Sequence, residues 1–258
     1  MADKKRVVIK VGTSTLTYDN GNLNIRRIEL LSQVISDLTH SGMEIVLVTS
    51  GAVGVGVSKM GFSERPKTTQ GKQAASAIGQ SELMSMYGKF FSEFGLRVAQ
   101  ILITKNVLED SERKENAVNA FNTLLSWGVV PIVNENDVIS TAEIEFGDND
   151  TLSEVVAELI GADELIILSD IDGLFDKDPA KYEDAKLIPV VHKVTEELKM
   201  AAGGAGTNRG TGGMVTKLIA AEKAINAGIE MVIINGKDPK MIYDVLEGKQ
   251  VGTKFSQN

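Results

Sequence analysis

The chain has 258 residues and a formal net charge of −8, from 27 basic and 35 acidic side chains. Its 43% hydrophobic and 24% charged residues are typical of a globular fold and exclude a largely disordered chain. The absence of cysteine and the presence of only two histidines argue against disulfides, thiolate or histidine metal sites and a cysteine nucleophile. The acidic balance argues against nucleic-acid and membrane partners, and no apolar run is long enough for a membrane span, so we expect a cytoplasmic protein.

Short, nearly continuous apolar segments alternate along the chain with segments of helical periodicity. The strand-length segments are 6–11, 44–49, 98–103, 129–134, 164–169 and 231–235. The helical segments are 25–41, 73–94, 113–127, 152–160, 214–227 and 240–246. This alternation predicts an α/β fold with a mostly parallel sheet and helices on both faces. Functional residues should then lie at the carboxyl ends of the strands.

We expect a single domain with two lobes, 1–160 and 161–258, hinged near Ile160. Residues 138–146, VISTAEIEF, alternate enough to form a β-hairpin or ribbon, which would be a candidate lid. Residues 202–213 are rich in glycine and are followed at once by an apolar helical pattern. That order favours a loop leading into a helix amino terminus over a disordered linker.

The first strand ends in KVGTST at 10–15. Gly12 lets the backbone approach a ligand closely, and the amides and hydroxyls of the three following residues can bind phosphate oxygens. Lys10 lies within the strand itself, where a lysine is costly unless its ammonium reaches a pocket or an ion pair. The alternative is an edge-strand lysine that keeps the edge soluble.

The second strand is followed by TSGAVGVG at 49–56. It lacks the third glycine of a dinucleotide fingerprint, and the chain contains no P-loop motif. Ser50 and the glycines that lead into a helix could bind a carboxylate or a phosphate. Tight packing of that helix could equally require the glycines.

Polar residues gather in NEND at 134–137 and GDNDTLSE at 147–154. Thr151 with Glu154 fits a capping box, which predicts a helix start there. That pattern does not explain the other polar residues, which are Asn134, Asp137, Asp148, Asn149 and Asp150. Together these side chains could hold an ammonium group and order cationic side chains.

LSDIDGLFDKDP at 168–179 contains an acidic D-x-D-G pattern, but it lacks the remaining ligands of an EF-hand. Downstream, TGGMVTK at 211–217 puts glycine amides at a helix amino terminus and Lys217 about one turn inside it. Amides and ammonium could converge there on one phosphate. The alternative for Lys217 is a solvated helix lysine.

The chain has no nucleophile elbow, so covalent acyl transfer has little support. If the phosphoryl acceptor is a carboxylate, no general base is needed, because a carboxyl with a pKa of about 4.3 is ionised at neutral pH. Catalysis then consists of positioning and cationic stabilisation of a loose transition state.

The ordered motifs IKVGTS, VTSGAVGVG, PIVNENDVI, FGDND, LSDIDGLF and GTGGMVTK resemble the amino-acid kinase family, over about residues 8–255. The resemblance implies a three-layer α/β/α sandwich with a mostly parallel central sheet of about eight strands. Within the family the motifs are most similar to members that phosphorylate the γ-carboxylate of L-glutamate with ATP. That reaction gives L-glutamyl 5-phosphate, in the first step of proline biosynthesis. Lobe 1–160 would bind glutamate and lobe 161–258 would bind ATP.

The resemblance also implies roles for individual residues. Lys10 and Lys217 would stabilise the transferred phosphoryl group, and Asp150 would orient both lysines. The glutamate-binding residues would be Ser50, Gly51, Ala52, Asn134, Asp137, Asp148 and Asn149. The ATP-binding residues would be Lys10, Gly12, Ser169, Asp170, Thr211, Gly212, Gly213, Met214, Val215, Thr216 and Lys217. Mg²⁺ is implied, and no protein ligand is assigned to it.

The partners implied are L-glutamate, proline as a feedback inhibitor, further copies of the chain in a homo-oligomer, and a functional link with glutamyl phosphate reductase. Many family members carry an additional carboxyl-terminal PUA domain, and we expect this chain to lack it, since it stops just after the last motif. The alternatives are a kinase of the same fold acting on a nucleoside monophosphate or carbamate, and a non-catalytic amino-acid sensor. Asp137 and the DND segment favour an acceptor with an ammonium group, and the two lysines with Asp150 argue against a sensor.

Overall fold

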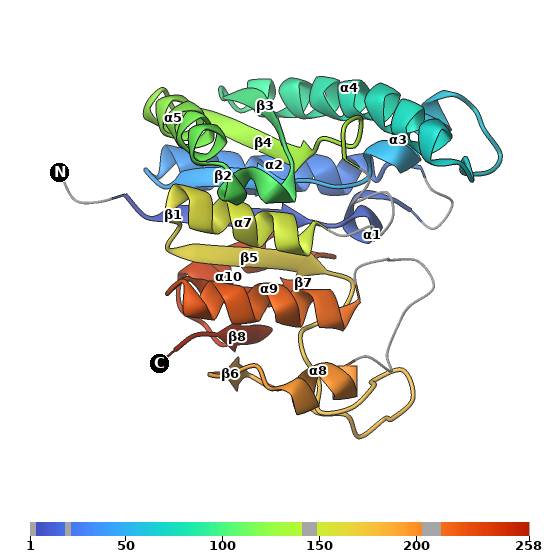
Figure 1. The fold of residues 1–258 in the computed structure, drawn as a ribbon. Helices are drawn as coiled ribbons and strands as arrows, with labels where there is room; N and C mark the ends of the chain where they lie inside the picture. Colours follow the sequence, from blue (N-terminus) through green and yellow to red (C-terminus); the bar gives the residue numbers. More distant parts are fainter. Residues whose placement is uncertain (1–3, 19–21, 141–148, 203–212, 258) are drawn as a thin grey trace.

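The computed structural model describes residues 4–18, 22–140, 149–202 and 213–257. An eight-stranded sheet forms its central layer, in the order β3-β4-β2-β1-β5-β7-β8-β6 (Figure 1). Among these neighbours only β7 and β8 are antiparallel. The strands are β1 (Arg6–Val11), β2 (Glu44–Val48), β3 (Arg97–Ile103), β4 (Val129–Glu135), β5 (Glu164–Ser169), β6 (Val190–Val191), β7 (Glu230–Asn235) and β8 (Thr253–Phe255).

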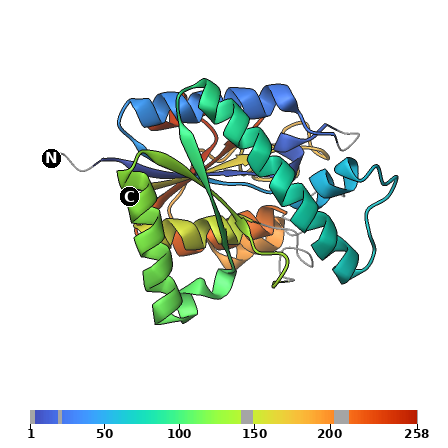
Figure 2. The ribbon, with the colours of Figure 1, turned by 90° about the horizontal axis from the view of Figure 1, so that it is seen from above.

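Helices cover both faces of the sheet (Figure 2). One layer contains α2 (Ile25–His40), α3 (Ala52–Lys59), α4 (Thr69–Glu93) and α10 (Met241–Leu246). The other contains α5 (Ser111–Ser126), α7 (Asp150–Ile160) and α9 (Met214–Asn226). The short elements are α1 (Thr13–Leu16), η1 (Lys105–Glu109) and α8 (Glu196–Ala202). The predicted α/β/α sandwich with a mostly parallel sheet is therefore confirmed.

All six predicted strands and all six predicted helices are present, with ends within a few residues of those expected. The sequence did not indicate β6, β8, α1, α8 or η1. These elements have two to seven residues, too few to show a period of 2 or 3.6 above the background of the chain. They form through contacts with distant segments, as β6 does by pairing with β8.

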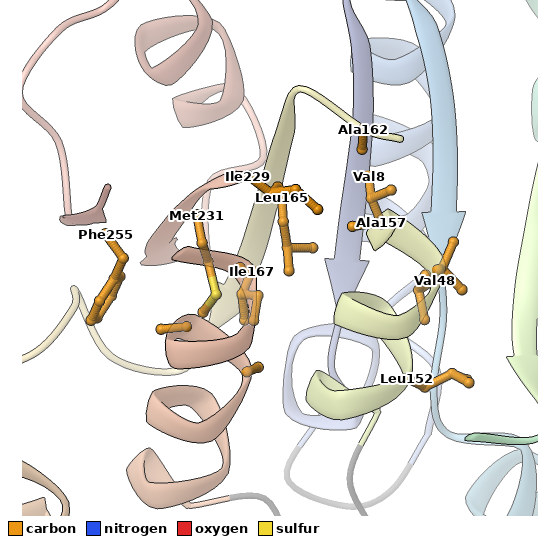
Figure 3. Close-up of a cluster of buried hydrophobic side chains, with 14 of the residues drawn as sticks. Val8, Val48, Leu152, Ala157, Ala162, Leu165, Ile167, Ile229, Met231 and Phe255 are labelled. Carbon is orange, nitrogen blue, oxygen red and sulfur yellow. The ribbon is translucent and has the colours of Figure 1, made fainter. Parts of the chain in front are cut away.

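Alternation along the strands divides the core into two clusters. Val8 of β1 packs with the α5, α7 and α9 layer, whereas Val7 and Ile9 pack with the α2, α3, α4 and α10 layer. Successive side chains of a strand point to opposite faces, so a buried strand supplies both clusters. Figure 3 shows part of the first cluster, in which Val8, Leu165 and Ile167 of the sheet pack together with Leu152 and Ala157 of α7. Lys10 has the parity of Val8 and therefore points toward α7 and α9.

The predicted capping box at Thr151 is wrong. Helix α7 begins at Asp150, two residues before the predicted start, with Asn149 as its N-cap, and Thr151 lies in the first turn. The Glu154 side chain is buried at 1% exposure, and its carboxylate lies 4.0 Å from Lys223 of α9 instead of capping the helix. The helix start is held by the ion pairs of Asp150, described below.

Two predictions concern segments that are largely outside the described residues. Of the ribbon expected at 138–146, residues 141–146 are not described, and Val138 and Ile139 form a turn after β4. Of the loop expected at 202–213, residues 203–212 are not described, but the helix expected after it begins at Met214. In the described parts of the chain no helix combines the length and the hydrophobicity that a membrane span requires.

Candidate active site

A buried aspartate holds two lysines at the carboxyl edge of the sheet. Lys10 Nζ lies 2.6 Å from Asp150 Oδ1, and Lys217 Nζ lies 2.9 Å from Asp150 Oδ2. The exposed fractions are 6% for Lys10, 7% for Lys217 and 0% for Asp150. The two ammonium groups are thus held on one buried carboxylate, and cations fixed in this way can stabilise the charge of an anionic ligand.

Three separate elements supply this group. Lys10 extends from the central strand β1, Asp150 is the first residue of α7 and Lys217 lies one turn into α9. A carboxylate in the first turn of a helix is stabilised by the helix dipole. The edge-strand interpretation of Lys10 and the solvated-helix interpretation of Lys217 are both wrong, because each side chain is buried in an ion pair.

The amino terminus of α9 also lies beside this group. Thr216 Oγ1 contacts Asp150 Oδ2 at 3.2 Å and the Gly213 carbonyl at 2.7 Å. A Cβ atom on Gly12 would lie 3.5 Å from Lys10 Nζ, so this glycine leaves the backbone close to the ammonium. Thr216 thus fixes Asp150 with a third contact, from the same helix that carries Lys217.

A cavity of about 160 Å³ adjoins Lys217. Ser169 at the end of β5, Asp170, Gly213 and Met214 line it together with Lys217. Apolar side chains complete the wall, among them Ile171, Leu174, Phe175 and Leu198. A cavity with an apolar part and a cationic end can hold an aromatic ring attached to a charged chain. Of the predicted ATP-binding residues, Thr211 and Gly212 lie outside the described residues.

A second polar group lies on the face covered by α4. Asn149 Nδ2 donates to the Thr49 carbonyl and to Asn134 Oδ1, each at 2.7 Å. Asn134 Nδ2 donates to Gln80 Oε1 of α4 at 2.8 Å. Thr49 Oγ1 lies 2.9 Å from the hydroxyl of Tyr87, also of α4. This network joins the ends of β2 and β4 to the residue that precedes Asp150.

Asp137 belongs to the same region and is 3% exposed. Its Oδ2 accepts a hydrogen bond from Ser76 of α4 at 2.5 Å, while its buried Oδ1 has no hydrogen-bond partner among the described residues. Burial raises the pKa of the Asp137 carboxyl, and the Ser76 hydrogen bond lowers it. A buried carboxylate oxygen without a partner is costly, so it marks a place for a cationic ligand.

The loop from β2 to α3 closes this region. Ser50 is buried, and Gly51 has φ 95°, a left-handed conformation that favours glycine. Ala52 begins α3, and its carbonyl packs so tightly against α4 that a Cβ on Gly79 would lie 1.8 Å from it. The predicted glutamate-binding residues therefore gather at one edge of the sheet, except Asp148, which lies outside the described residues.

Sequence reasoning missed the contribution of α4. Its polar residues Gln73, Ser76, Gln80 and Tyr87 each contact a residue of the second polar group. Their spacing of three, four and seven residues places them on one face of a helix. That spacing was the available signal, since buried polar residues on one helix face need partners.

The sequence pattern of the amino acid kinase family matches residues 5–235 of this chain. The chain belongs to the amino acid kinase family. This kinase is 54% identical over 259 residues to "Glutamate 5-kinase" of Clostridium perfringens, a match covering 99% of this chain and 96% of that protein. It is 50% identical over 250 residues to the protein of the same name from Caldanaerobacter subterraneus, covering 97% of this chain and 67% of that protein.

Solved structures show the same fold. The UMP kinase of Bacillus anthracis matches this kinase with a TM-score of 0.67 at 17% identity, covering 98% of this chain and 96% of that one. The carbamate kinase of Giardia lamblia bound to AMP-PNP matches with a TM-score of 0.68 at 17% identity, covering 99% and 100%. At such identities the comparison bears on the fold alone.

Proposed function

We propose that this kinase transfers the γ-phosphoryl group of ATP to the γ-carboxylate of L-glutamate in the cytoplasm, as the first step of proline biosynthesis. The products are L-glutamyl 5-phosphate and ADP. The observation that carries the proposal is the pair of buried lysines on opposite oxygens of Asp150. Asp137 Oδ1, which is buried without a hydrogen-bond partner among the described residues, and the glutamate 5-kinase relatives support glutamate as the acceptor.

The α-ammonium group of glutamate would bind Asp137 Oδ1. Asn149 Oδ1 is a second buried acceptor without a hydrogen-bond partner among the described residues, and both acceptors suit an ammonium group. Ser50, Gly51, Ala52, Asn134 and Asp148 would complete this part of the site. The γ-carboxylate would then point toward Lys10 and Lys217, since Asn149 is followed directly by Asp150.

In the reaction, a γ-carboxylate oxygen attacks the γ-phosphorus of ATP while the bond from that phosphorus to the β,γ-bridging oxygen breaks. No proton has to be removed from the acceptor, because the carboxylate is already ionised. Lys10 and Lys217 face the negative charge on the transferred group, and Asp150 holds both ammonium groups in place.

The nucleotide would occupy the cavity beside Lys217, with its base against the apolar wall and its phosphates at the amino terminus of α9. Gly12, Ser169, Asp170 and residues 211–217 would contact it. We assign no protein ligand to Mg²⁺, which the phosphates and water would hold. When bound, Mg²⁺ neutralises charge on the phosphates.

The similarity to the glutamate 5-kinase relatives also leads us to propose that the chain works as one kinase domain, with 1–160 binding glutamate and 161–258 binding ATP. We also propose a homo-oligomer, inhibition by proline, and a functional link with glutamyl phosphate reductase, which would consume the unstable acyl phosphate. A nucleoside monophosphate or carbamate acceptor fits less well. Neither acceptor carries the primary ammonium group that the partnerless oxygen of Asp137 would receive.

The proposal is tested by incubating the protein with ATP, Mg²⁺, glutamate and hydroxylamine, which traps an acyl phosphate as a hydroxamate. We expect hydroxamate and ADP in equal amounts, and neither when glutamate is omitted. Product with UMP or carbamate instead of glutamate would assign the alternative kinase activity. Glutamate binding without turnover of any acceptor would assign a sensor.

A further inference from the structure

The polar face of α4 contains one donor that the network above leaves without a partner. Gln80 is 6% exposed, and its Oε1 accepts from Asn134 Nδ2 at 2.8 Å. Its Nε2 is buried and has no hydrogen-bond partner among the described residues. A buried donor without a partner destabilises a protein, so we expect a ligand to accept the hydrogen bond from Gln80 Nε2.

The orientation of the Gln80 amide follows from its neighbours. Asn134 Oδ1 accepts from the backbone N–H of Glu135 at 3.0 Å, and a backbone N–H can only donate. Asn134 therefore donates from Nδ2 to Gln80, and Gln80 must accept this hydrogen bond with Oε1. The group that Gln80 has left for a ligand is its Nε2 donor.

We propose that Gln80 binds the α-carboxylate of the amino-acid acceptor through Nε2 and thereby selects acceptors that carry this group. The inference rests on the proposed function, since it assumes that glutamate occupies this site. It adds a substrate contact from α4 to those expected from the loops after β2 and β4.

The position of Gln80 supports the α-carboxylate over the γ-carboxylate. Gln80 lies one helical turn after Ser76, which holds Asp137, and residues four apart on a helix have Cβ atoms about 5–6 Å from each other. The α-ammonium and α-carboxylate of an amino acid are attached to one carbon, so their partners must be close together. Gln80 belongs to α4 and lies on the side of the sheet that α4 covers. Lys10, Lys217 and Asp150 lie on the other side, with α7 and α9.

The electrostatic character of the site points the same way. Among the described residues, Asp137 Oδ1 and Asn149 Oδ1 are buried acceptors without a hydrogen-bond partner, and Gln80 Nε2 is a buried donor without one. An amino-acid head group has a cation for the two acceptors and an anion for the donor. An acceptor without an α-carboxylate would leave Nε2 unsatisfied, and a site with such a group discriminates strongly against it.

The test compares Gln80→Glu with Gln80→Met at pH 8, using the hydroxamate assay. The Gln80→Glu substitution keeps the acceptor for Asn134 but replaces the Nε2 donor by an oxygen. Methionine removes both groups at similar volume. We expect KM for glutamate to rise roughly 10–100-fold in Gln80→Met and further in Gln80→Glu, with kcat changed far less. Gln70→Glu and Gln70→Met, on an exposed residue of the same helix, are the matched controls and should leave KM unchanged.

A second measurement separates binding from support of Asn134. Inhibition constants against glutamate are measured for 4-aminobutyrate, which lacks the α-carboxylate, and for glutarate, which lacks the ammonium group. If Gln80 contacts the α-carboxylate, Gln80→Met weakens glutarate and glutamate about equally but leaves 4-aminobutyrate nearly unaffected.

Other outcomes overturn the inference. A Gln80→Glu enzyme with normal KM, or equal weakening of all three ligands in Gln80→Met, would limit Gln80 to holding Asn134. Melting curves without ligand identify a variant that fails to fold, and Gln80→Asn, which shortens the side chain but keeps the amide, then takes its place. Failure of the unsubstituted enzyme to form any hydroxamate would contradict the proposed function instead.

Discussion

At the scale of single residues, Asp150 explains how two lysines can be buried. Each lysine alone would lose its hydration without compensation, but both bind oxygens of one carboxylate. The carboxylate in turn is held by Thr216 and by the first turn of α7. The lysines are therefore fixed before substrate binds, and fixed cations stabilise a transition state without reorganising.

Lys217→Ala should lower kcat on the order of a hundredfold or more and change KM for glutamate little, because its ammonium faces charge on the transferred group. Steady-state kinetics at saturating ATP measure both parameters. Lys240→Ala, an exposed lysine that precedes α10, is the control and should behave as the unsubstituted enzyme. A raised KM with normal kcat would remove Lys217 from catalysis.

At the scale of elements, the contact between α3 and α4 depends on two glycines. A Cβ on Gly79 would lie 1.8 Å from the Ala52 carbonyl, and one on Gly56 would lie 1.8 Å from the Ala75 carbonyl. The two helices therefore approach backbone to backbone. This approach brings the Ser50–Gly51 turn toward the polar face of α4, which carries Ser76 and Gln80.

Gly79→Ala should destabilise the protein by about 1–3 kcal/mol or more, because α3 and α4 must separate. Gly88→Ala lies in the same helix with open space around its Cβ and should be neutral or stabilising by up to about 1 kcal/mol. Urea denaturation of both variants measures the difference. Equal stability of the two variants would show that the contact tolerates a methyl group.

The contact between α7 and α9 contains a second buried carboxyl, Glu154, in addition to Asp150. The pKa of the Glu154 carboxyl is raised to about 7, because the increase caused by burial, together with a smaller increase from Glu158, exceeds the decrease caused by Lys223. The folded protein then keeps a proton on Glu154 that the unfolded chain, with a pKa of about 4.3, loses first. The stability that this protonation supplies is complete below about pH 4.3 and is lost as the pH rises to about 7.

Glu154→Gln should remove that dependence, because an amide fills the same space without charge. Above pH 7 the variant should be more stable than the unsubstituted protein, by at most about 3 kcal/mol, and the difference should shrink toward pH 4.5. Denaturation at pH 5, 6, 7 and 8 measures it. Glu158→Gln, on the next turn of α7, is the control and should show a much smaller change. A difference independent of pH would mean that Glu154 is ionised throughout.

The features that the sequence predicts are set by neighbouring residues, whereas the features that it misses depend on contacts between residues far apart in the sequence. The strands β1 and β5 matched the prediction residue for residue, because a strand buried on both faces is a continuous apolar run. The helix start at Asp150 was missed by two residues, because Asp150 forms ion pairs to Lys10 and Lys217, which are far away in the sequence. Gln80 was missed for the same reason, since its partner Asn134 is 54 residues away.

At the scale of the whole molecule, strand order brings the two polar groups together. From the central strand β1 the sheet extends through β2 and β4 on one side and through β5 and β7 on the other. Such a reversal opens a crevice at the carboxyl ends of the strands. Lys10 lies on β1 at this point, Asn134 on one side of it and Ser169 on the other. An acceptor and a nucleotide can therefore approach each other across β1.

Proline should compete with glutamate without reaching the lysines. Its cationic nitrogen and α-carboxylate can bind Asp137 and Gln80, but it has no γ-carboxylate to extend toward Lys10 and Lys217. Proline should accordingly raise the apparent KM for glutamate and leave kcat unchanged at saturating glutamate.

Two variants test where proline binds. Lys217→Ala should lose turnover but keep the rise in melting temperature that proline causes, whereas Asp137→Asn should lose that rise. Hydroxamate assays across a glutamate titration, with melting curves of both variants, measure these effects. Superimposed curves at every proline concentration would show that proline does not bind, and a lowered kcat would place it outside the glutamate site.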